Sequence, residues 1–100
     1  MAGVFECDDD TGYFYLYETG GAQGQKILGA IQVLVGSPDF QQDDIAIRWN
    51  AIDSLVGFFV RSQLWAAFDV KNGAKYGGNY RSGGSPEIPK EISRAFDIAG

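Results

Sequence analysis

The sequence contains no histidine and only one cysteine among its 100 residues. The usual general base of acid–base catalysis and the imidazole ligands of metal sites are therefore both missing. One cysteine cannot form an intramolecular disulfide or a zinc cluster, and acidic neighbours disfavour the reactive thiolate form of Cys7. These absences make an enzyme the less favoured interpretation, and we predict no cofactor and no metal.

Basic side chains are also scarce, with eight Lys and Arg against thirteen Asp and Glu and a net charge of -5. Such a field repels phosphate backbones, so we expect no nucleic-acid partner. Residues 1–60 hold nine acidic and two basic side chains, whereas residues 61–100 hold four and six. This asymmetry is consistent with a surface that docks a charged partner or a second copy, and equally with an unevenly charged solvated surface.

Long hydrophobic runs are absent as well. The longest, 27–35 and 55–60, fall far short of the roughly 20 residues that a membrane-spanning helix needs. The N-terminal residues lack the basic and apolar regions of a secretory signal. We therefore expect a soluble, cytoplasmic protein that does not bind membranes. With 45% hydrophobic residues in so short a chain, residues 1–100 are predicted to form a single domain.

Alternating apolar residues, typical of β-strands, are abundant. Strands at 3–7 and 13–18 flank a turn-rich segment, which predicts a β-hairpin. Because strand side chains alternate between two faces, three tyrosines of the second strand share one face: Tyr13, Tyr15 and Tyr17. The other face carries Phe14 and Leu16. The glycine-rich segment 19–25 is predicted to be a loop.

Residues 27–35 favour a strand, although Leu28, Ile31 and Val35 also fit one stripe of a short helix, which remains the alternative. Four further strands are predicted, at 45–50, 55–61, 64–70 and 74–80. Ser62-Gln63 is a two-residue connection, which indicates a tight hairpin between the middle two of these strands.

A helix of about ten residues closes the chain, a common helix length. Its apolar stripe comprises Ile88, Ile92, Ala95 and Phe96. The helix begins near Ser85-Pro86, or at Pro89 if it is shorter. These elements predict an α+β fold: an antiparallel, meander-like, curved β-sheet of about six to seven strands with one C-terminal amphipathic helix.

The central strands carry large apolar groups on both faces. Phe58 lies opposite Phe59, and on the next strand Trp65 lies opposite Leu64 and Phe68. One short helix cannot cover both faces of such a sheet, and large exposed apolar patches are rare in monomers. The sheet must therefore curl on itself or pack against a second copy of the chain. We favour a homodimer, because closed two-fold pairs are the commonest oligomers.

The first candidate binding surface combines the three tyrosines with an acidic cluster, Asp8, Asp9 and Asp10. Together they favour a non-enzymatic interaction module for a protein partner; one version is an immunity-like or antitoxin-like protein that neutralises a basic partner. With Glu6, the cluster could also bind a hard cation, but it lacks the spacing of a calcium loop. A solvated acidic turn is the better interpretation.

The second candidate surface is aromatic. Trp49 and Trp65 are best explained as core or dimer contacts, yet with Phe96 they could line an apolar pocket between sheet and helix. A small-molecule-binding protein or minor enzyme is therefore the alternative function. A third set interleaves basic and aromatic residues, as in sites that stack bases: Lys71, Lys75, Tyr76, Tyr80 and Arg81. An ordinary edge hairpin explains that set better in so acidic a chain.

The N-terminal run Phe5-Glu6-Cys7-Asp8-Asp9-Asp10-Thr11-Gly12-Tyr13-Phe14-Tyr15 resembles the F-E-x-D-x-x-T-G-Y-F-Y signature of a family of small bacterial proteins of unknown function. Later blocks of that family resemble Ile47-Arg48-Trp49 and Ala66-Ala67-Phe68-Asp69, so the resemblance covers roughly residues 4 to 70. It implies an α+β protein built on an antiparallel sheet and no assigned activity. The chain is also similar in type to products of mobile gene cassettes, such as those of integrons.

Overall fold

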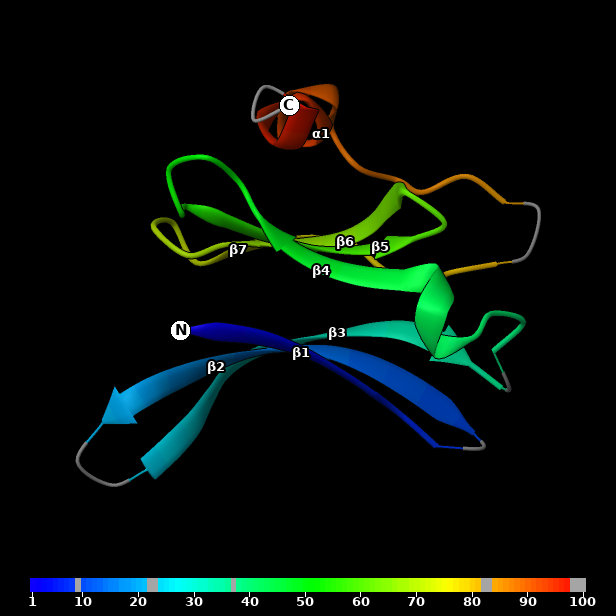
Figure 1. Cartoon of the computed structure of the whole chain (residues 1–100), viewed down its shortest axis with the longest axis horizontal. Coiled ribbons are helices and arrows are strands. Elements are labelled where there is room, and N and C mark those ends of the chain that lie inside the picture. The colour runs from blue at the N-terminus through cyan, green and yellow to red at the C-terminus, as the bar shows by residue number, and fades with distance from the viewer. Residues whose placement is uncertain (9, 22–23, 37, 82–83, 98–100) are drawn as a thin grey trace.

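The strands divide between two antiparallel sheets that pack face to face (Figure 1). The computed structural model describes residues 1–8, 10–21, 24–36, 38–81 and 84–97. Within them, the first sheet has the order β1-β2-β3 and comprises β1 (Ala2–Cys7), β2 (Thr11–Gly21) and β3 (Gly24–Val35). The second has the order β4-β5-β6-β7 and comprises β4 (Ile45–Trp49), β5 (Leu55–Val60), β6 (Gln63–Asp69) and β7 (Ala74–Gly77). A short 3-10 helix, η1 (Gln42–Asp44), precedes β4, and helix α1 (Lys90–Asp97) follows the second sheet.

The predicted α+β class, with antiparallel meanders and a C-terminal helix, is confirmed. The strands form two sheets rather than one curved sheet, because the chain between β3 and β4 crosses from one layer to the other and these two strands do not pair. Residues 27–35 belong to β3, so the helical alternative for them is wrong.

Most of the predicted loop 19–25 is strand. β2 and β3 stay paired as far as Gly21 and Gly24, because backbone pairing needs no side chain. Residues 22–23, also part of that predicted loop, lie outside the described residues.

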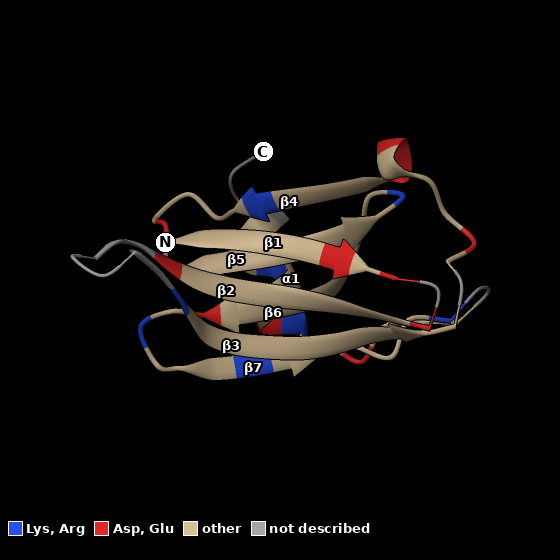
Figure 2. Ribbon diagram, turned by 90° about the horizontal axis from the view of Figure 1, so that it is seen from below, with Lys and Arg blue, Asp and Glu red and all other residues tan. Residues whose placement is uncertain are grey.

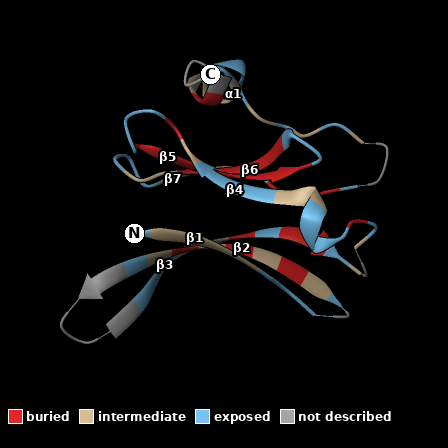
Figure 3. Ribbon diagram, viewed as in Figure 1, coloured by how far each residue is buried: buried red, intermediate tan, exposed pale blue. Residues whose placement is uncertain are grey.

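The larger core lies between the two sheets (Figure 3). Its most deeply buried side chains are Phe14, Phe58, Val33 and Val56. The ring of Phe58 lies 4.5 Å from that of Phe5 and 5.7 Å from that of Phe14, measured between centroids. Phe5 and Phe14 belong to the first sheet and Phe58 to the second, so aromatic contacts join the two layers directly.

A second core lies between the four-stranded sheet and α1, which covers the outer face of that sheet (Figure 1). It contains Leu55, Phe59, Leu64, Ala67 and Phe96. The helix begins at Lys90, directly after Pro89, as in the shorter of the two predicted versions. One chain thus covers both faces of its central strands. The large apolar side chains on those two faces therefore no longer argue for a second copy.

A β-bulge interrupts the alternation of side chains along β6. Phe58 pairs with Ala66 and Phe59 with Leu64, which leaves Trp65 as the extra residue. Trp65 and Phe68 consequently both join the core between the sheets, whereas the unbroken alternation places them on opposite faces.

The hairpin between β5 and β6 is confirmed, but its turn is Arg61-Ser62, one residue earlier than predicted. Both residues have positive φ, 49° and 69°, as a two-residue hairpin turn of type I′ requires.

The chain that leaves β7 closes one side of the sandwich. The N–H of Gly78 donates to the carbonyl oxygen of Trp65 over 2.8 Å, and the N–H of Asn79 donates to that of Gln32 over 3.2 Å. These bonds tie the segment to β6 in one sheet and to β3 in the other. The predicted edge strand 74–80 therefore ends at Gly77, and the segment beyond it bridges the two sheets.

Candidate functional site

The three predicted tyrosines line the outer face of the three-stranded sheet, as expected from their alternation with the buried Phe14 and Leu16. The rings of Tyr13 and Tyr15 stack with centroids 5.8 Å apart, and those of Tyr15 and Tyr17 lie 5.9 Å apart at a tilt of 59°. All three side chains are half-buried. The strand thus holds them in a continuous ladder that is open to solvent.

Small and aliphatic residues flank Tyr15 and Tyr17 on the neighbouring strands, whereas Glu6 and Gln32 flank Tyr13. On β1, Val4 pairs with Tyr15; on β3, Ala30 pairs with Tyr15 and Ile27 with Tyr17. Ile27 is 51% exposed. We call this surface the tyrosine face, comprising Val4, Tyr13, Tyr15, Tyr17, Ile27 and Ala30. Figure 2 views the molecule from this side. The central parts of β1, β2 and β3 carry no charged residues in this view.

Charged side chains lie toward the two ends of the tyrosine face. Glu6 pairs with Tyr13 at one end, next to the turn that carries Asp8 and Asp10. At the other end Lys26 pairs with Glu18, and because strand side chains alternate, this pair belongs to the opposite face of the sheet from Tyr17. Desolvation by its neighbours, together with the negative charge of Glu6, raises the pKa of Tyr15. The tyrosine face is therefore acidic at the end that carries Glu6.

The acidic cluster is organised as a turn. Oδ1 of Asp8 accepts hydrogen bonds of 2.8 Å from the backbone N–H groups of Asp10 and Thr11. These bonds lower the pKa of Asp8, because they stabilise its charged form. Asp9 lies outside the described residues. Among the residues that are described, no group of three or more acidic or cysteine side chains is placed to hold a metal ion.

The structure separates Phe96 from the two tryptophans, because Trp49 packs against the core that contains Trp65 and Phe96 belongs to the other core. Trp65 is 2% exposed in the core between the sheets, whereas Phe96 lies in the core beneath α1, on the other side of the four-stranded sheet. Apolar side chains fill the space between sheet and helix in which the pocket was predicted. Trp49 is half-buried and lines a hollow of about 400 Å³ with Met1, Asp53 and Val70. This hollow lies at one end of β4, and none of these lining residues belongs to α1.

The basic and aromatic residues between 71 and 81 are likewise dispersed. Tyr76 packs against the core beneath α1, and Tyr80 joins the core between the sheets. Neither ring is free to stack on a base, because each is part of the packing. Lys71 and Arg81 stay exposed on separate turns.

A hydrogen-bonded network that the sequence does not predict surrounds Tyr80. Its hydroxyl donates to Oδ1 of Asp39 over 2.6 Å and accepts a bond of 3.2 Å from Nη1 of Arg61. Nη2 of Arg61 also donates to the backbone carbonyl of Asp39 and lies 3.6 Å from a carboxylate oxygen of Asp44. The network ties the loop before β4 to the β5–β6 turn and to the segment after β7. No local pattern indicates it, because its members are far apart in the sequence.

The hydroxyl of Tyr80 should make stability depend on pH in the alkaline range. Burial and the hydrogen bond to Asp39 raise its pKa above the ordinary value of 10.0. A group whose pKa is raised by folding stabilises the protein below its ordinary pKa, and that contribution is lost as the pH rises through the folded pKa. We expect Tyr80→Phe to lower the free energy of unfolding by about 1–2 kcal/mol at neutral pH. As the pH rises above about 10, the variant should lose less of its remaining stability than the unmodified chain does.

Urea unfolding followed by far-UV circular dichroism, at neutral pH and at several alkaline values, measures this difference. Tyr17→Phe, which removes a hydroxyl from the solvent-facing ladder, serves as the control and should leave neutral stability within about 0.5 kcal/mol. A stability gap between Tyr80→Phe and the unmodified chain that stays constant across the alkaline range contradicts the prediction.

No protein-family model, curated protein or solved structure matches the chain. The resemblance to small bacterial proteins of unknown function therefore stays a prediction. Among the described residues, no helix has the length and apolar character that crossing a membrane requires.

Proposed function

We propose that this protein is a non-enzymatic protein-interaction module that binds through the tyrosine face, and that its partner there is a second copy of the chain. One observation carries the proposal. Each sheet buries its inner face against the other, and α1 covers the outer face of the four-stranded sheet, but no described element covers the outer face of the three-stranded sheet.

Tyrosine suits such a surface. Its ring supplies a large contact area with few rotatable bonds, and its hydroxyl tolerates water when the surface is free. Tyrosine is also enriched at protein interfaces, whereas charged residues are depleted from their centres. The tyrosine face has this composition, because its centre is Tyr15 between Val4 and Ala30, and its one paired charged residue, Glu6, lies at the end beside Tyr13.

The position of Glu6 at one end of the tyrosine face favours an antiparallel two-fold pair of identical chains. If two faces pack with their strands antiparallel, Glu6 and Asp8 of one copy lie at the opposite end of the interface from those of the other, so like charges stay apart. Three strands about 4.8 Å apart, with eight residues of about 3.3 Å each, make a face of several hundred Å². Two such faces bury on the order of 1,000 Å², near the lower limit for a specific interface. We therefore expect a reversible dimer.

Sedimentation equilibrium of the pure protein, from about 10 to 300 µM, tests the proposal across the range of weak, reversible association. The unmodified chain should shift from a 10.9 kDa species toward twice that mass as its concentration rises. Tyr15→Ser should weaken dimerisation at least about tenfold, because Tyr15 is the centre of the ladder and central aromatic residues dominate interface energies. Ile52→Ser, on a turn remote from the tyrosine face, is the matched control and should dimerise normally.

Two results contradict the proposal. A chain that remains at 10.9 kDa over the whole range does not pair with itself, and its acidic end would then favour a partner with a basic surface. A dimer that Tyr15→Ser leaves unchanged uses another surface.

A further inference from the structure

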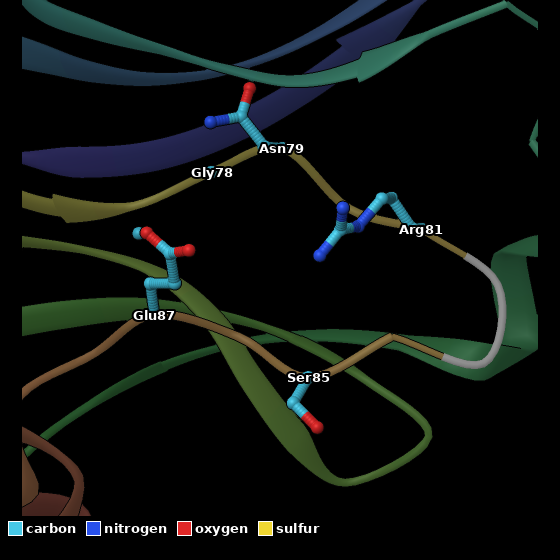
Figure 4. A pocket seen from close by; sticks show the side chains of 6 residues that line it. Gly78, Asn79, Arg81, Ser85 and Glu87 are labelled. Atoms are coloured by element: carbon cyan, nitrogen blue, oxygen red, sulfur yellow. The ribbon is translucent and has the colours of Figure 1, made fainter.

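A polar cleft of about 400 Å³ lies between the segment that leaves β7 and the segment that leads to α1 (Figure 4). It is lined by Gly77, Gly78, Asn79, Arg81, Ser85 and Glu87. Asn79 and Arg81 come from one wall, and Ser85 and Glu87 from the other. The cleft is separate from the tyrosine face, which lies on the outer side of the other sheet.

The wall that carries Arg81 begins on a fixed backbone. Gly77, Gly78 and Asn79 all have positive φ, at 81°, 104° and 55°. Hydrogen bonds from Gly78 to β6 and from Asn79 to β3 hold this run in place. A β-carbon on Gly77 would lie 2.2 Å from the carbonyl oxygen of Trp65, so the chain presses directly against β6 there. Glycine adopts positive φ readily and asparagine is enriched there, so the sequence permits this path and the hydrogen bonds to both sheets fix it.

Two opposite charges face each other across the cleft. In Figure 4 the guanidinium of Arg81 and the carboxylate of Glu87 both point into the space between the walls. Within the described part of the chain, neither forms an ion pair or a side-chain hydrogen bond, in contrast to Arg61, which contacts Asp39 and Asp44. The cleft therefore presents a cation on one wall and an anion on the other, with room between them.

We propose that this cleft binds a small zwitterion, a free α-amino acid, with its carboxylate on Arg81 and its ammonium group on Glu87. A planar guanidinium binds a carboxylate through two parallel hydrogen bonds, and a carboxylate accepts hydrogen bonds from an ammonium group. The volume lies within the range of small-ligand sites, and the lining is polar, which excludes a largely apolar ligand. A ligand with one charge can pair with only one of the two side chains and lies near the other, which has the same sign. The cleft therefore favours a ligand that carries both charges.

Titration of the isotopically labelled chain with glycine, L-serine and L-leucine, followed by amide chemical shifts, tests the proposal. We expect saturable shifts at Gly78, Asn79, Arg81 and Glu87, with a dissociation constant in the range of about 0.1–10 mM for so small a ligand. The N-acetyl derivative of L-leucine lacks the cation and L-leucinamide lacks the carboxylate. Each should bind at least about tenfold more weakly than L-leucine, because each loses one charge-assisted pair.

Two charge-removing substitutions assign the roles of the walls. Arg81→Gln and Glu87→Gln should each weaken binding of L-leucine at least about tenfold, since a charged hydrogen-bonding pair is lost in each. Both side chains are exposed, so the fold should be unaffected. Glu91→Gln and Arg94→Gln, on exposed positions of α1, are the matched controls and should bind normally.

Three results overturn the proposal. One is the absence of saturable shifts with all three amino acids. A second is equal binding of L-leucine and either of its one-charge derivatives, which would mean that a single charge is recognised. The third is unchanged binding in both Arg81→Gln and Glu87→Gln, which would place the ligand elsewhere.

Discussion

Phe58→Ala is expected to lower the free energy of unfolding by about 3–5 kcal/mol. Phe58 is fully buried between the two sheets, and its ring contacts those of Phe5 and Phe14 in the first sheet and Phe40 in the loop before β4. Removing the ring leaves a cavity that two rigid sheets cannot close. Domains of this size have a total stability of about 5–15 kcal/mol, so the loss is a large part of it.

Urea unfolding measures this loss as a shift of the transition midpoint at unchanged slope. Ile52→Ala is the control, because Ile52 is 70% exposed and its truncation should change stability by no more than about 0.5 kcal/mol. If Phe58→Ala costs less than about 2 kcal/mol, the two sheets are not joined through this aromatic cluster.

The sequence predicts the strands well because each depends on local alternation. Tyr13, Tyr15 and Tyr17 alternate with Phe14 and Leu16, and the structure places the two sets on opposite faces of β2. The same pattern does not reveal which face meets the solvent, since both faces are aromatic or aliphatic. That outcome depends on the second sheet, which packs against the Phe14 side.

The division of the strands into two sheets cannot be predicted from local sequence patterns. Apolar groups on both faces of β5 fit a dimer, a curled sheet or a sandwich equally well, because each arrangement covers both faces. The bulge at Trp65 adds a further difficulty. A single extra residue reverses the alternation of every position after it, and no residue type in β6 marks its place.

Among the candidate sites, too, local sequence patterns predict some and not others. The tyrosine ladder is predictable because its three members lie within five residues of one another. The Tyr80 network and the polar cleft are not, because they join residues from separate elements, such as Asp39 with Tyr80 and Arg81 with Glu87. Trp49, Trp65 and Phe96 illustrate the converse: pattern alone could group these three aromatic residues, yet the four-stranded sheet separates Phe96 from the core that Trp49 and Trp65 share.

Gly77→Ala should destabilise the protein by roughly 3 kcal/mol or more, through two separate effects. The positive φ of 81° is strained for any residue with a β-carbon and costs about 1–2 kcal/mol. The new β-carbon would also lie 2.2 Å from the carbonyl oxygen of Trp65 and 3.0 Å from its carbon, both of which are backbone atoms. Backbone must therefore shift, and the bond from Gly78 to that same oxygen is disturbed.

Gly73→Ala separates these two effects. Gly73 has a similar φ of 69°, but a β-carbon there meets nothing within 4 Å, so only the strain of about 1–2 kcal/mol applies. The difference between the two variants in urea unfolding measures the steric cost of approaching β6. Amide exchange at Asn79 and Tyr80 should accelerate in Gly77→Ala alone, because their bonds to β3 depend on the path that Gly77 permits. If the two variants lose equal stability and amide exchange at Asn79 and Tyr80 is unchanged, the segment after β7 does not hold the two sheets together. The backbone beneath Arg81 in the polar cleft would then not be fixed.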